Sequence, residues 1–237
     1  MKNTAIVLAA GRGKRMQSNT PKQYLEIAGK PVLYYTLKAF ENSFIDSIVL
    51  VAAEDEMEFC KKEIVEKYGF TKVKEVIAGG KERYHSVMNG IFSAKPCDYI
   101  YIHDGARPFV TSDMLMRLSK TVEKEKACVA AMPVKDTIKI ADENGYVADT
   151  PAREYIWTIQ TPQVFSYELI KEAYNILKKE ENTLKEKKIQ ITDDAMVVET
   201  FLGERVKLVE GSYSNIKITT PEDMDIASEL MKKYEFS

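Results

Sequence analysis

The sequence predicts an α/β protein, in which a mostly parallel twisted sheet carries helices on both faces and a β-hairpin protrudes as an arm. Short runs of small and β-branched apolar residues alternate with segments whose apolar residues recur at helical spacing. An Asn-Gly pair between two extended runs adds the signature of a hairpin. The chain has 237 residues, 45% of them hydrophobic, which is enough for one large domain with a real core.

Strands and helices are expected to alternate through the first half of the chain, which is typical of a parallel sheet covered on both faces. The first apolar run, residues 5–10, is expected to form a strand buried on both faces. The strands expected in this half are 5–10, Ser47–Ala52, 72–78, 98–103 and Ala127–Pro133. The helices expected here are 31–42, 54–68, Arg83–Ser93, and one that Thr111 or Ser112 caps and that ends near residue 126. Functional loops of such sheets gather at the carboxyl ends of the strands, where the sequence has the loops 11–22, 79–86 and 104–107.

The hairpin is expected at residues 137–141 and 146–150, on either side of the turn that contains Asn144 and Gly145. A lone two-stranded hairpin is marginally stable in water, so it needs cover from the body of the chain or from a second subunit. We interpret residues 136–160 as an arm used in dimerisation, inserted into a single domain that spans 1–237. The alternative is a hairpin that folds back onto its own domain.

The remaining residues are expected to form further helices and two short strands. Residues 156–161 bring the chain back to the body, and 166–181 form a helix. The lysine- and glutamate-rich stretch around 182–188 is expected to be a solvated helix end or a loop. Asp193 and Asp194 open another helix, where carboxylates suit the positive end of the helix dipole. The short strands expected are 206–210 and 216–219, and Thr220 with Pro221 begins the last helix.

Composition and charge exclude several classes of protein. The net charge of −2 gives no global field that would attract nucleic acid or a membrane surface. No apolar run reaches the roughly 18 residues of a membrane span, and the first residues lack a signal-peptide pattern. The three cysteines are typical of reduced thiols in a cytoplasmic protein, and two histidines make a histidine-based metal site unfavourable.

The first loop is the strongest candidate for a phosphate-binding site. Two glycines, Gly11 and Gly13, let the backbone approach a ligand closely. Four cations and no acidic residue accompany them, which favours a polyphosphate: Arg12, Lys14, Arg15 and Lys22. The alternative is an ordinary tight turn between strand and helix. Met16 stands where a dinucleotide fingerprint needs its third glycine, which disfavours a dehydrogenase, and the Walker A pattern is absent.

Other loops contribute single candidates, each with a plainer structural alternative. Asp104 ends a strand beside Gly105, where it is suited to hold Mg²⁺ on phosphate oxygens or only to cap a turn. Arg107 could bind an anion or form a structural ion pair. Lys217 lies between apolar neighbours and points at an anion or at solvent.

Nine motifs resemble one family in their order and spacing: AAGRGKRM, PKQYLEIAGKPVL, AGGKERYHSV, HDGARPF, PVKDTIK, TPAR, QTPQ, TDDA and NIKITTPED. This is the family of 2-C-methyl-D-erythritol 4-phosphate cytidylyltransferases of non-mevalonate isoprenoid biosynthesis, and the resemblance covers residues 6–231. It implies a Rossmann-like nucleotidyltransferase fold. It also implies that CTP and 2-C-methyl-D-erythritol 4-phosphate give 4-diphosphocytidyl-2-C-methyl-D-erythritol and pyrophosphate.

Two alternatives stay open beside this reading. Ribitol-5-phosphate cytidylyltransferases share most of the motifs, although HDGARP and TPAR are more similar to the erythritol-phosphate enzymes. A non-catalytic module that only binds CTP is the alternative from another class. It would not require Arg15, Lys22, Asp104 and Lys217 together.

The resemblance also implies a role for each matching residue. Arg15 and Lys22 match the catalytic pair that stabilises the transition state, Lys217 a basic residue at the α-phosphate, and Asp104 the Mg²⁺ ligand. The residues that match the nucleotide site are Ala9, Ala10, Gly11, Gly13, Gly80, Lys81, Ser86, Gly105 and Arg107. The residues that match the acceptor site are Thr137, Arg153 and Thr161, with Arg153 reaching it from the partner subunit's arm in a homodimer.

Two positions depart from the pattern of the family. Lys81 stands where some members carry aspartate, so a contact to the base would come from its main chain. Ser214 stands where some relatives have an acidic residue, so phosphates and water would complete the shell of the metal.

Overall fold

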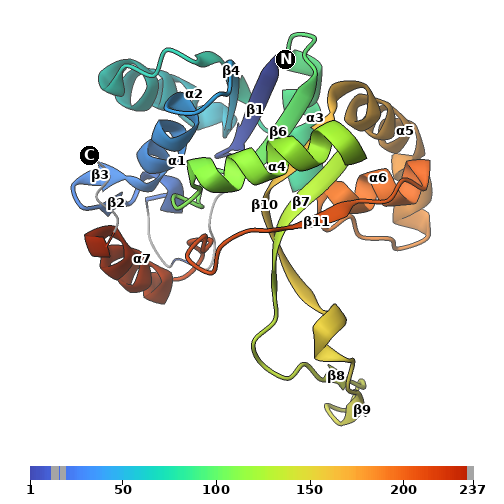
Figure 1. Ribbon diagram of the computed structural model, residues 1–237. Coiled ribbons are helices and arrows are strands. Elements are labelled where there is room, and N and C mark those ends of the chain that lie inside the picture. The colour runs from blue at the N-terminus through green and yellow to red at the C-terminus, as the bar shows by residue number, and fades with distance from the viewer. Residues whose placement is uncertain (12–15, 17–19, 234–237) are drawn as a thin grey trace.

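A seven-stranded sheet forms the centre of the computed structural model, which describes residues 1–11, 16 and 20–233 (Figure 1). The strand order is β11-β7-β10-β6-β1-β4-β5, and β10 is antiparallel to both of its neighbours while the other pairs are parallel. Its strands are β1 (Asn3–Leu8), β4 (Ser47–Ala52), β5 (Val73–Ala78), β6 (Tyr99–Asp104), β7 (Ala127–Pro133), β10 (Trp157–Ser166) and β11 (Lys207–Glu210). The predicted α/β class and mostly parallel sheet are therefore confirmed.

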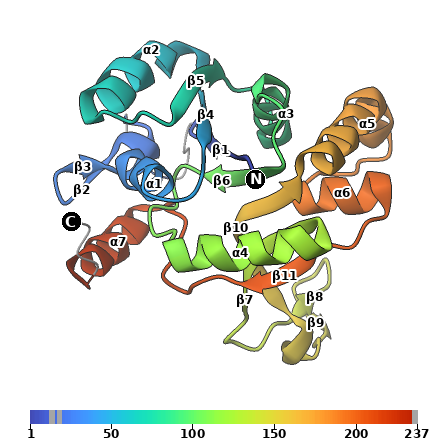
Figure 2. The same ribbon diagram turned by 45° about the horizontal axis from the view of Figure 1, so that its top comes forward.

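Helices cover both faces of this sheet, as the tilted view shows (Figure 2). Successive residues of β1 serve opposite faces: Ala5 and Val7 pack in one apolar cluster, and Ile6 packs in the other. The first cluster includes α1 (Val32–Glu41), α2 (Met57–Phe59) and α4 (Ser112–Glu125). The second includes α3 (Arg83–Ser93), α5 (Tyr167–Glu186) and α6 (Asp194–Leu202). Both faces are thus removed from water, and each fully buried aliphatic side chain contributes about 1.5–3 kcal/mol.

The carboxyl ends of four parallel strands, β6, β1, β4 and β5, are joined by main-chain hydrogen bonds at one edge of the sheet. Ala9 N–H donates to Val51 O at 2.7 Å, and Gly79 N–H donates to Ala52 O at 2.7 Å. Gly105 N–H donates to Leu8 O at 2.8 Å. The loops that follow β1, β5 and β6 therefore begin side by side, as the sequence predicted.

The segment expected as one helix over 54–68 is helical but changes its hydrogen-bond spacing. It consists of the 3₁₀-helix η3 (Glu54–Glu56), the short α2 and the π-helix η4 (Cys60–Glu66). Cys60 and Ile64, two of the residues at helical spacing, are buried. The remaining short elements are η2 (Lys22–Tyr24), β2 (Glu26–Ile27) and β3 (Lys30–Pro31).

The predicted hairpin forms from β8 (Ile140–Ala141) and β9 (Val147–Asp149), which pair antiparallel. Gly145 has a positive φ of 84°, and the Asp142 carboxylate accepts the N–H groups of Asn144 and Tyr146 at 2.9 Å each. The hairpin stands apart from the sheet at the end of an extension that leaves from β7 and returns through β10 (Figure 1). All residues from 135 to 150 are exposed, and η5 (Arg153–Tyr155) lies on the returning segment.

One expectation for the second half was wrong, and one alternative that the sequence left open is now decided. Residues 216–219 do not form a strand of the sheet, although the Ile218 N–H donates to Ala106 O at 2.9 Å and so fixes the segment beside β6. The helix expected over 166–181 continues to Glu186. The last helix, α7 (Pro221–Lys233), packs against the β2–β3 region through Ala227 and Met231. None of the helices in the described part of the chain is both long and apolar enough to cross a membrane.

Candidate active site

A pocket of about 180 Å³ opens at the carboxyl edge of the sheet and collects residues from distant segments. Three of the predicted charged residues meet there: Lys22 from η2, Asp104 from the end of β6, and Lys217 from the segment before α7. The other residues that line it are Leu8, Ala10, Gly11, Arg83, Ser86 and Ala106. Arg15 and Gly13 lie outside the residues that the structure describes.

Asp104 is the electrostatic centre of this pocket. Its Oδ2 lies 2.8 Å from Lys217 Nζ and 3.7 Å from Arg107 Nε, and its Oδ1 lies 3.6 Å from Arg83 Nε. Burial by itself would raise the pKa of the carboxyl, but the cations of Lys217, Arg83 and Arg107 hold that pKa well below its usual range. Asp104 is therefore a carboxylate at any physiological pH.

Thr161 connects Asp104 to the buried His103. The Asp104 N–H donates to Thr161 Oγ1 at 3.1 Å, and that oxygen lies 3.0 Å from His103 Nδ1. His103 Nε2 must donate to Arg107 O, 3.0 Å away, because a carbonyl only accepts. Burial lowers the pKa of His103 to about 4, so the ring is neutral and its Nδ1 accepts the hydroxyl proton of Thr161. Thr161 Oγ1 can therefore accept a hydrogen bond from a substrate hydroxyl but cannot donate one, because its hydroxyl proton is donated to His103 Nδ1.

A second pocket, of about 300 Å³, shares Arg83, Asp104 and Lys217 with the first and includes the predicted Arg107 and Thr161. A buried side-chain network fixes the backbone on this side. Arg107 Nη1 donates to Asn215 O at 2.7 Å. Asn215 Nδ2 donates to Gln160 Oε1 at 3.1 Å and to Thr161 O at 2.9 Å. Asn215 thereby anchors the segment that carries Lys217, two residues further on.

The predicted nucleotide loop after β5 is shaped by close contacts. Gly80 N–H donates to the buried Ser86 Oγ at 3.0 Å. A Cβ on Gly80 would lie 2.2 Å from His85 Cβ, and one on Gly79 would lie 2.5 Å from Ala10 Cβ, so neither position has room for a side chain. These glycines let the loop approach the end of β1 closely.

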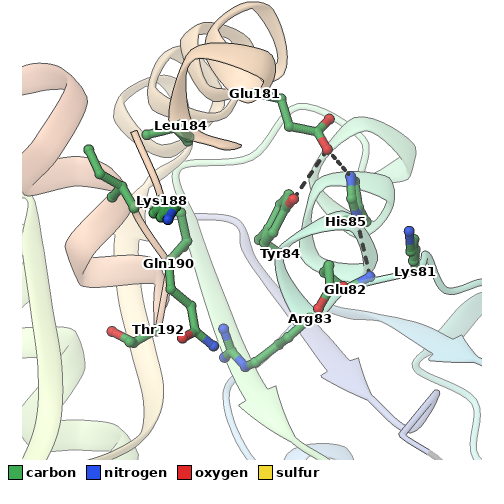
Figure 3. Close-up of a pocket in the computed structure, with 12 residues that line it drawn as sticks. Lys81, Glu82, Arg83, Tyr84, His85, Glu181, Leu184, Lys188, Gln190 and Thr192 are labelled. Atoms are coloured by element: carbon green, nitrogen blue, oxygen red, sulfur yellow. Dashed lines mark hydrogen bonds and ion pairs between the residues drawn. The ribbon is translucent and has the colours of Figure 1, made fainter. Parts of the chain in front are cut away.

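Lys81 lies on a different and larger pocket of about 670 Å³, between the start of α3 and the connection from α5 to α6 (Figure 3). There Tyr84 and His85 are both directed at Glu181, whose Oε1 lies 3.2 Å from the Tyr84 hydroxyl and 3.2 Å from His85 Nε2. Arg83 is shared by this pocket and the two pockets around Asp104.

Asp193 and Asp194 open α6 as predicted, but Arg83 was not predicted as a site residue and neither was its pairing with Asp194. Asp193 alone caps α6, accepting the Met196 N–H at 2.9 Å. Asp194 instead turns inward, fully buried, and accepts two hydrogen bonds from Arg83 at 2.9 and 2.8 Å. The signal for this pair was present, because one carboxylate suffices for a cap and TDDA has two.

Two residues predicted for the acceptor site, Thr137 and Arg153, lie on the extension and away from the pockets around Asp104. Thr137 is exposed. Arg153 Nη1 donates to Lys135 O at 3.0 Å, and Arg153 lines an open pocket of about 420 Å³ near the base of the arm. Neither residue is among the described residues that line the pockets around Asp104. Their role in binding the acceptor remains a prediction.

The described residues contain no group of three or more histidine, cysteine, aspartate or glutamate side chains that could hold a metal ion by themselves. Any metal at Asp104 would therefore need further ligands from substrate or water. Mg²⁺ is commonly held in this way, by one or two carboxylates together with phosphate oxygens.

Comparison with known proteins agrees with this arrangement. The family model for 2-C-methyl-D-erythritol 4-phosphate cytidylyltransferase matches residues 3–233. The enzyme of this name from Lachnospira eligens is 52% identical over 231 residues, covering 97% of this chain and 99% of the relative. The one from Lachnoclostridium phytofermentans is 47% identical over 234 residues, covering 99% and 98%. A crystal structure of 4-diphosphocytidyl-2C-methyl-D-erythritol synthase from Anaerococcus prevotii superposes with a TM-score of 0.83 at 36% identity, covering 98% of this chain and 96% of the other.

The match extends over nearly the whole chain, and the solved relative has the same fold. The resemblance seen in the motifs is thereby confirmed. The chain belongs to the 2-C-methyl-D-erythritol 4-phosphate cytidylyltransferase family and is a nucleotidyltransferase.

Proposed function

We propose that this chain transfers a cytidylyl group from CTP to 2-C-methyl-D-erythritol 4-phosphate at the pockets around Asp104, as a step of isoprenoid biosynthesis. One observation carries the assignment to this place: Lys217 Nζ lies 2.8 Å from Asp104 Oδ2 in a pocket that Lys22 also lines. Membership of the family supports the reaction itself.

The reaction exchanges one phosphate ester linkage for another. An oxygen of the acceptor phosphate forms a bond to the α-phosphorus of CTP. The bond from that phosphorus to the oxygen bridging to the β-phosphate breaks, and pyrophosphate leaves with the electron pair. The attacking phosphate is already ionised near neutral pH, so the reaction depends on positioning two polyanions and stabilising negative charge.

Cationic side chains meet that need in this proposal. Lys22 and Lys217 stabilise the charge that develops on the α-phosphate oxygens, together with Arg15, whose part rests on the resemblance alone. Lys217 is held in place by Asp104 before substrate arrives, so its charge needs little reorganisation during the reaction. Gly11, Gly80 and the Ser86 loop provide the surface on which the nucleotide lies.

The residues present fit a magnesium ion at Asp104. Asp104 Oδ2 lies 2.8 Å from Lys217 Nζ, whereas Asp104 Oδ1 lies 3.6 Å from Arg83 Nε. Asp104 would hold Mg²⁺ together with phosphates and water, since Ser214 offers no second carboxylate. Bound there, the ion would neutralise charge on the phosphates of CTP.

We place the acceptor in the 300 Å³ pocket beside Thr161, with Thr137 and Arg153 supplied by the arm of a second subunit. Support for a homodimer comes from apolar side chains that the arm leaves in water: Ile140, Tyr146, Val147 and Tyr155 are between 51% and 77% exposed. Such a patch on a protruding hairpin is typical of an interface.

A reducing compartment such as the cytoplasm suits the cysteines. Cys60, Cys97 and Cys128 are free. Burial raises the pKa of Cys60 to about 11 and that of Cys128 to about 12, which keeps both as unreactive thiols.

An assay of pyrophosphate release from CTP in the presence of Mg²⁺ tests the proposal. Release should require 2-C-methyl-D-erythritol 4-phosphate, and ribitol 5-phosphate should support it far less. Binding of CTP without pyrophosphate release would instead support a non-catalytic module. Faster release with ribitol 5-phosphate would overturn the choice of acceptor.

A further inference from the structure

Arg83 lies between two carboxylates that come from different elements. Its Nη1 and Nη2 donate to Asp194 Oδ1 and Oδ2 at 2.9 and 2.8 Å, so one edge of the guanidinium is fully engaged at the start of α6. Its Nε lies 3.6 Å from Asp104 Oδ1, beyond hydrogen-bond distance. The stronger pair is therefore with Asp194, the carboxylate that lies away from the pocket of Lys22.

Asp194 is itself held by two other residues, Tyr174 and Gln163. The hydroxyl of the buried Tyr174, on α5, donates to Asp194 Oδ1 at 2.6 Å. The N–H groups of Asp194 and Ala195 both donate to Gln163 Oε1, on β10, at 3.0 Å. Asp194 cannot follow Arg83 toward the pocket, so it determines where the guanidinium lies.

The two carboxylates compete for the same cation. A guanidinium that meets a carboxylate with no rival forms a bidentate pair with N–O distances of about 2.7–2.9 Å. With Asp194 present, Arg83 contributes positive charge to Asp104 at a distance and leaves Oδ1 accessible to another ligand. Without the charge of Asp194, Asp104 would be the nearest carboxylate, and Arg83 would close onto Oδ1.

We propose that Asp194 is a positioning residue that withholds Arg83 from Asp104 and so keeps Asp104 Oδ1 available to the divalent cation that accompanies CTP. The inference rests on the proposed metal-binding role of Asp104. It assigns a function to a buried ion pair that otherwise would only join α3 to α6.

Binding of Mn²⁺ in the presence of CTP, followed by the electron paramagnetic resonance signal of free Mn²⁺, gives a readout that does not depend on turnover. Asp194→Asn should weaken Mn²⁺ binding by about tenfold, which is within the usual range of coupling between neighbouring groups. In an R83Q background the same change should alter the affinity by less than about twofold, because no guanidinium is left to occupy Asp104.

A matched control is Asp193→Asn, which removes the neighbouring negative charge but keeps an oxygen that can cap the helix, and leaves the Arg83–Asp194 pair intact. It should retain the Mn²⁺ affinity of the parent protein. Circular dichroism and thermal melting check that each variant is folded. If Asp194→Asn does not fold, Tyr174→Phe removes one anchor of Asp194 and should weaken Mn²⁺ binding in the same direction, by about two- to threefold.

The outcomes separate this inference from the function on which it rests. If Asp104→Asn binds Mn²⁺ as well as the parent protein does, the metal site at Asp104 is wrong. If Asp104→Asn loses binding while Asp194→Asn, or Tyr174→Phe in its place, retains it, only the positioning role is overturned. An equal loss from Asp194→Asn with and without Arg83 would show a purely structural contribution and would also overturn it.

Discussion

The pocket around Asp104 and the protruding arm are both expected to bind phosphate groups, but their side chains are held very differently. Asp104 is nearly buried and meets Lys217, Arg83 and Arg107 within its own chain. Arg153 is exposed, and its guanidinium donates to a main-chain carbonyl, Lys135 O, at 3.0 Å. One site is assembled when the chain folds, whereas the proposed role of the arm requires a second subunit.

This difference matches the chemistry asked of each region. Groups that stabilise a transition state must be fixed beforehand, because reorganising charge during the reaction raises the barrier. Groups that only capture a substrate can be ordered by binding, at the expense of some affinity. We therefore expect changes near Asp104 to lower turnover and changes on the arm to weaken acceptor binding.

The largest effect should follow from removing a cation of the Asp104 pocket. Lys22→Ala is expected to lower kcat by at least about 10²-fold, the usual loss for one charge-stabilising group. Steady-state pyrophosphate release measures it, and Lys62→Ala, which removes an exposed lysine paired with Glu58, should have little effect. A folded Lys22→Ala protein with parental turnover would remove Lys22 from the catalytic machinery.

Next in size is the effect of Arg153→Ala. The KM for the acceptor should rise about tenfold or more, while the KM for CTP changes little, because a lost phosphate contact weakens the binding of one substrate. Lys139→Ala is the control on the same arm, since Lys139 Nζ donates to Thr150 Oγ1. A change confined to the KM for CTP would contradict the assignment of the arm.

Mixing these two variants tests whether the arm acts on the partner subunit. In a dimer formed from one Lys22→Ala and one Arg153→Ala chain, an arm that acts in trans leaves one of the two sites intact. At an acceptor concentration well below KM, where Arg153→Ala dimers turn over little, random exchange of subunits should then give about a quarter of the parental activity. No recovery, despite confirmed exchange, would mean that Arg153 serves its own subunit.

The same contrast explains which features could be predicted from sequence. The strands and most helices followed from apolar periodicity, and loops that follow parallel strands necessarily meet at one edge, so Asp104 and Lys22 could be brought together in advance. Lys217 could be added to them only through the resemblance to the family. The second aspartate of TDDA hinted that one carboxylate was not needed as a cap, but its partner Arg83 could not be identified, because that pairing depends on how α3 and α6 are placed relative to each other in the folded chain. The sequence pattern also wrongly predicted a strand at residues 216–219. The position of this segment depends on hydrogen bonds to loops rather than on a strand partner.

A smaller effect on activity, but a clear one on assembly, is expected from polar changes on the hairpin. Tyr146→Asp together with Val147→Asp should dissociate the proposed dimer at micromolar concentrations. The two aspartates would replace exposed apolar side chains and place negative charge in the interface. Light scattering after gel filtration measures the mass. Thermal stability of the subunit should hardly change, since both side chains are exposed. An unchanged dimer would place the interface elsewhere.

The smallest expected effect concerns a carboxylate that is well held but far from both regions. Glu41 accepts hydrogen bonds from Thr71 N–H at 2.8 Å and Lys72 N–H at 3.0 Å, and also from the Thr71 hydroxyl. Although burial opposes it, these donors lower the pKa of Glu41 below its ordinary 4.5. Its stabilisation is therefore present above the pKa of the unfolded state and is lost as the pH falls through the lower pKa of the folded state.

Glu41→Gln should lower the free energy of unfolding by about 1 kcal/mol near pH 7, and the difference from the parent should shrink below about pH 4. Urea denaturation at both pH values measures it, and turnover at neutral pH should not change. A loss of the same size at both pH values would show that packing, not charge, is responsible. If turnover fell as well, ordered carboxylates throughout the body would matter for catalysis, and the contrast between the Asp104 pocket and the rest of the fold would not hold.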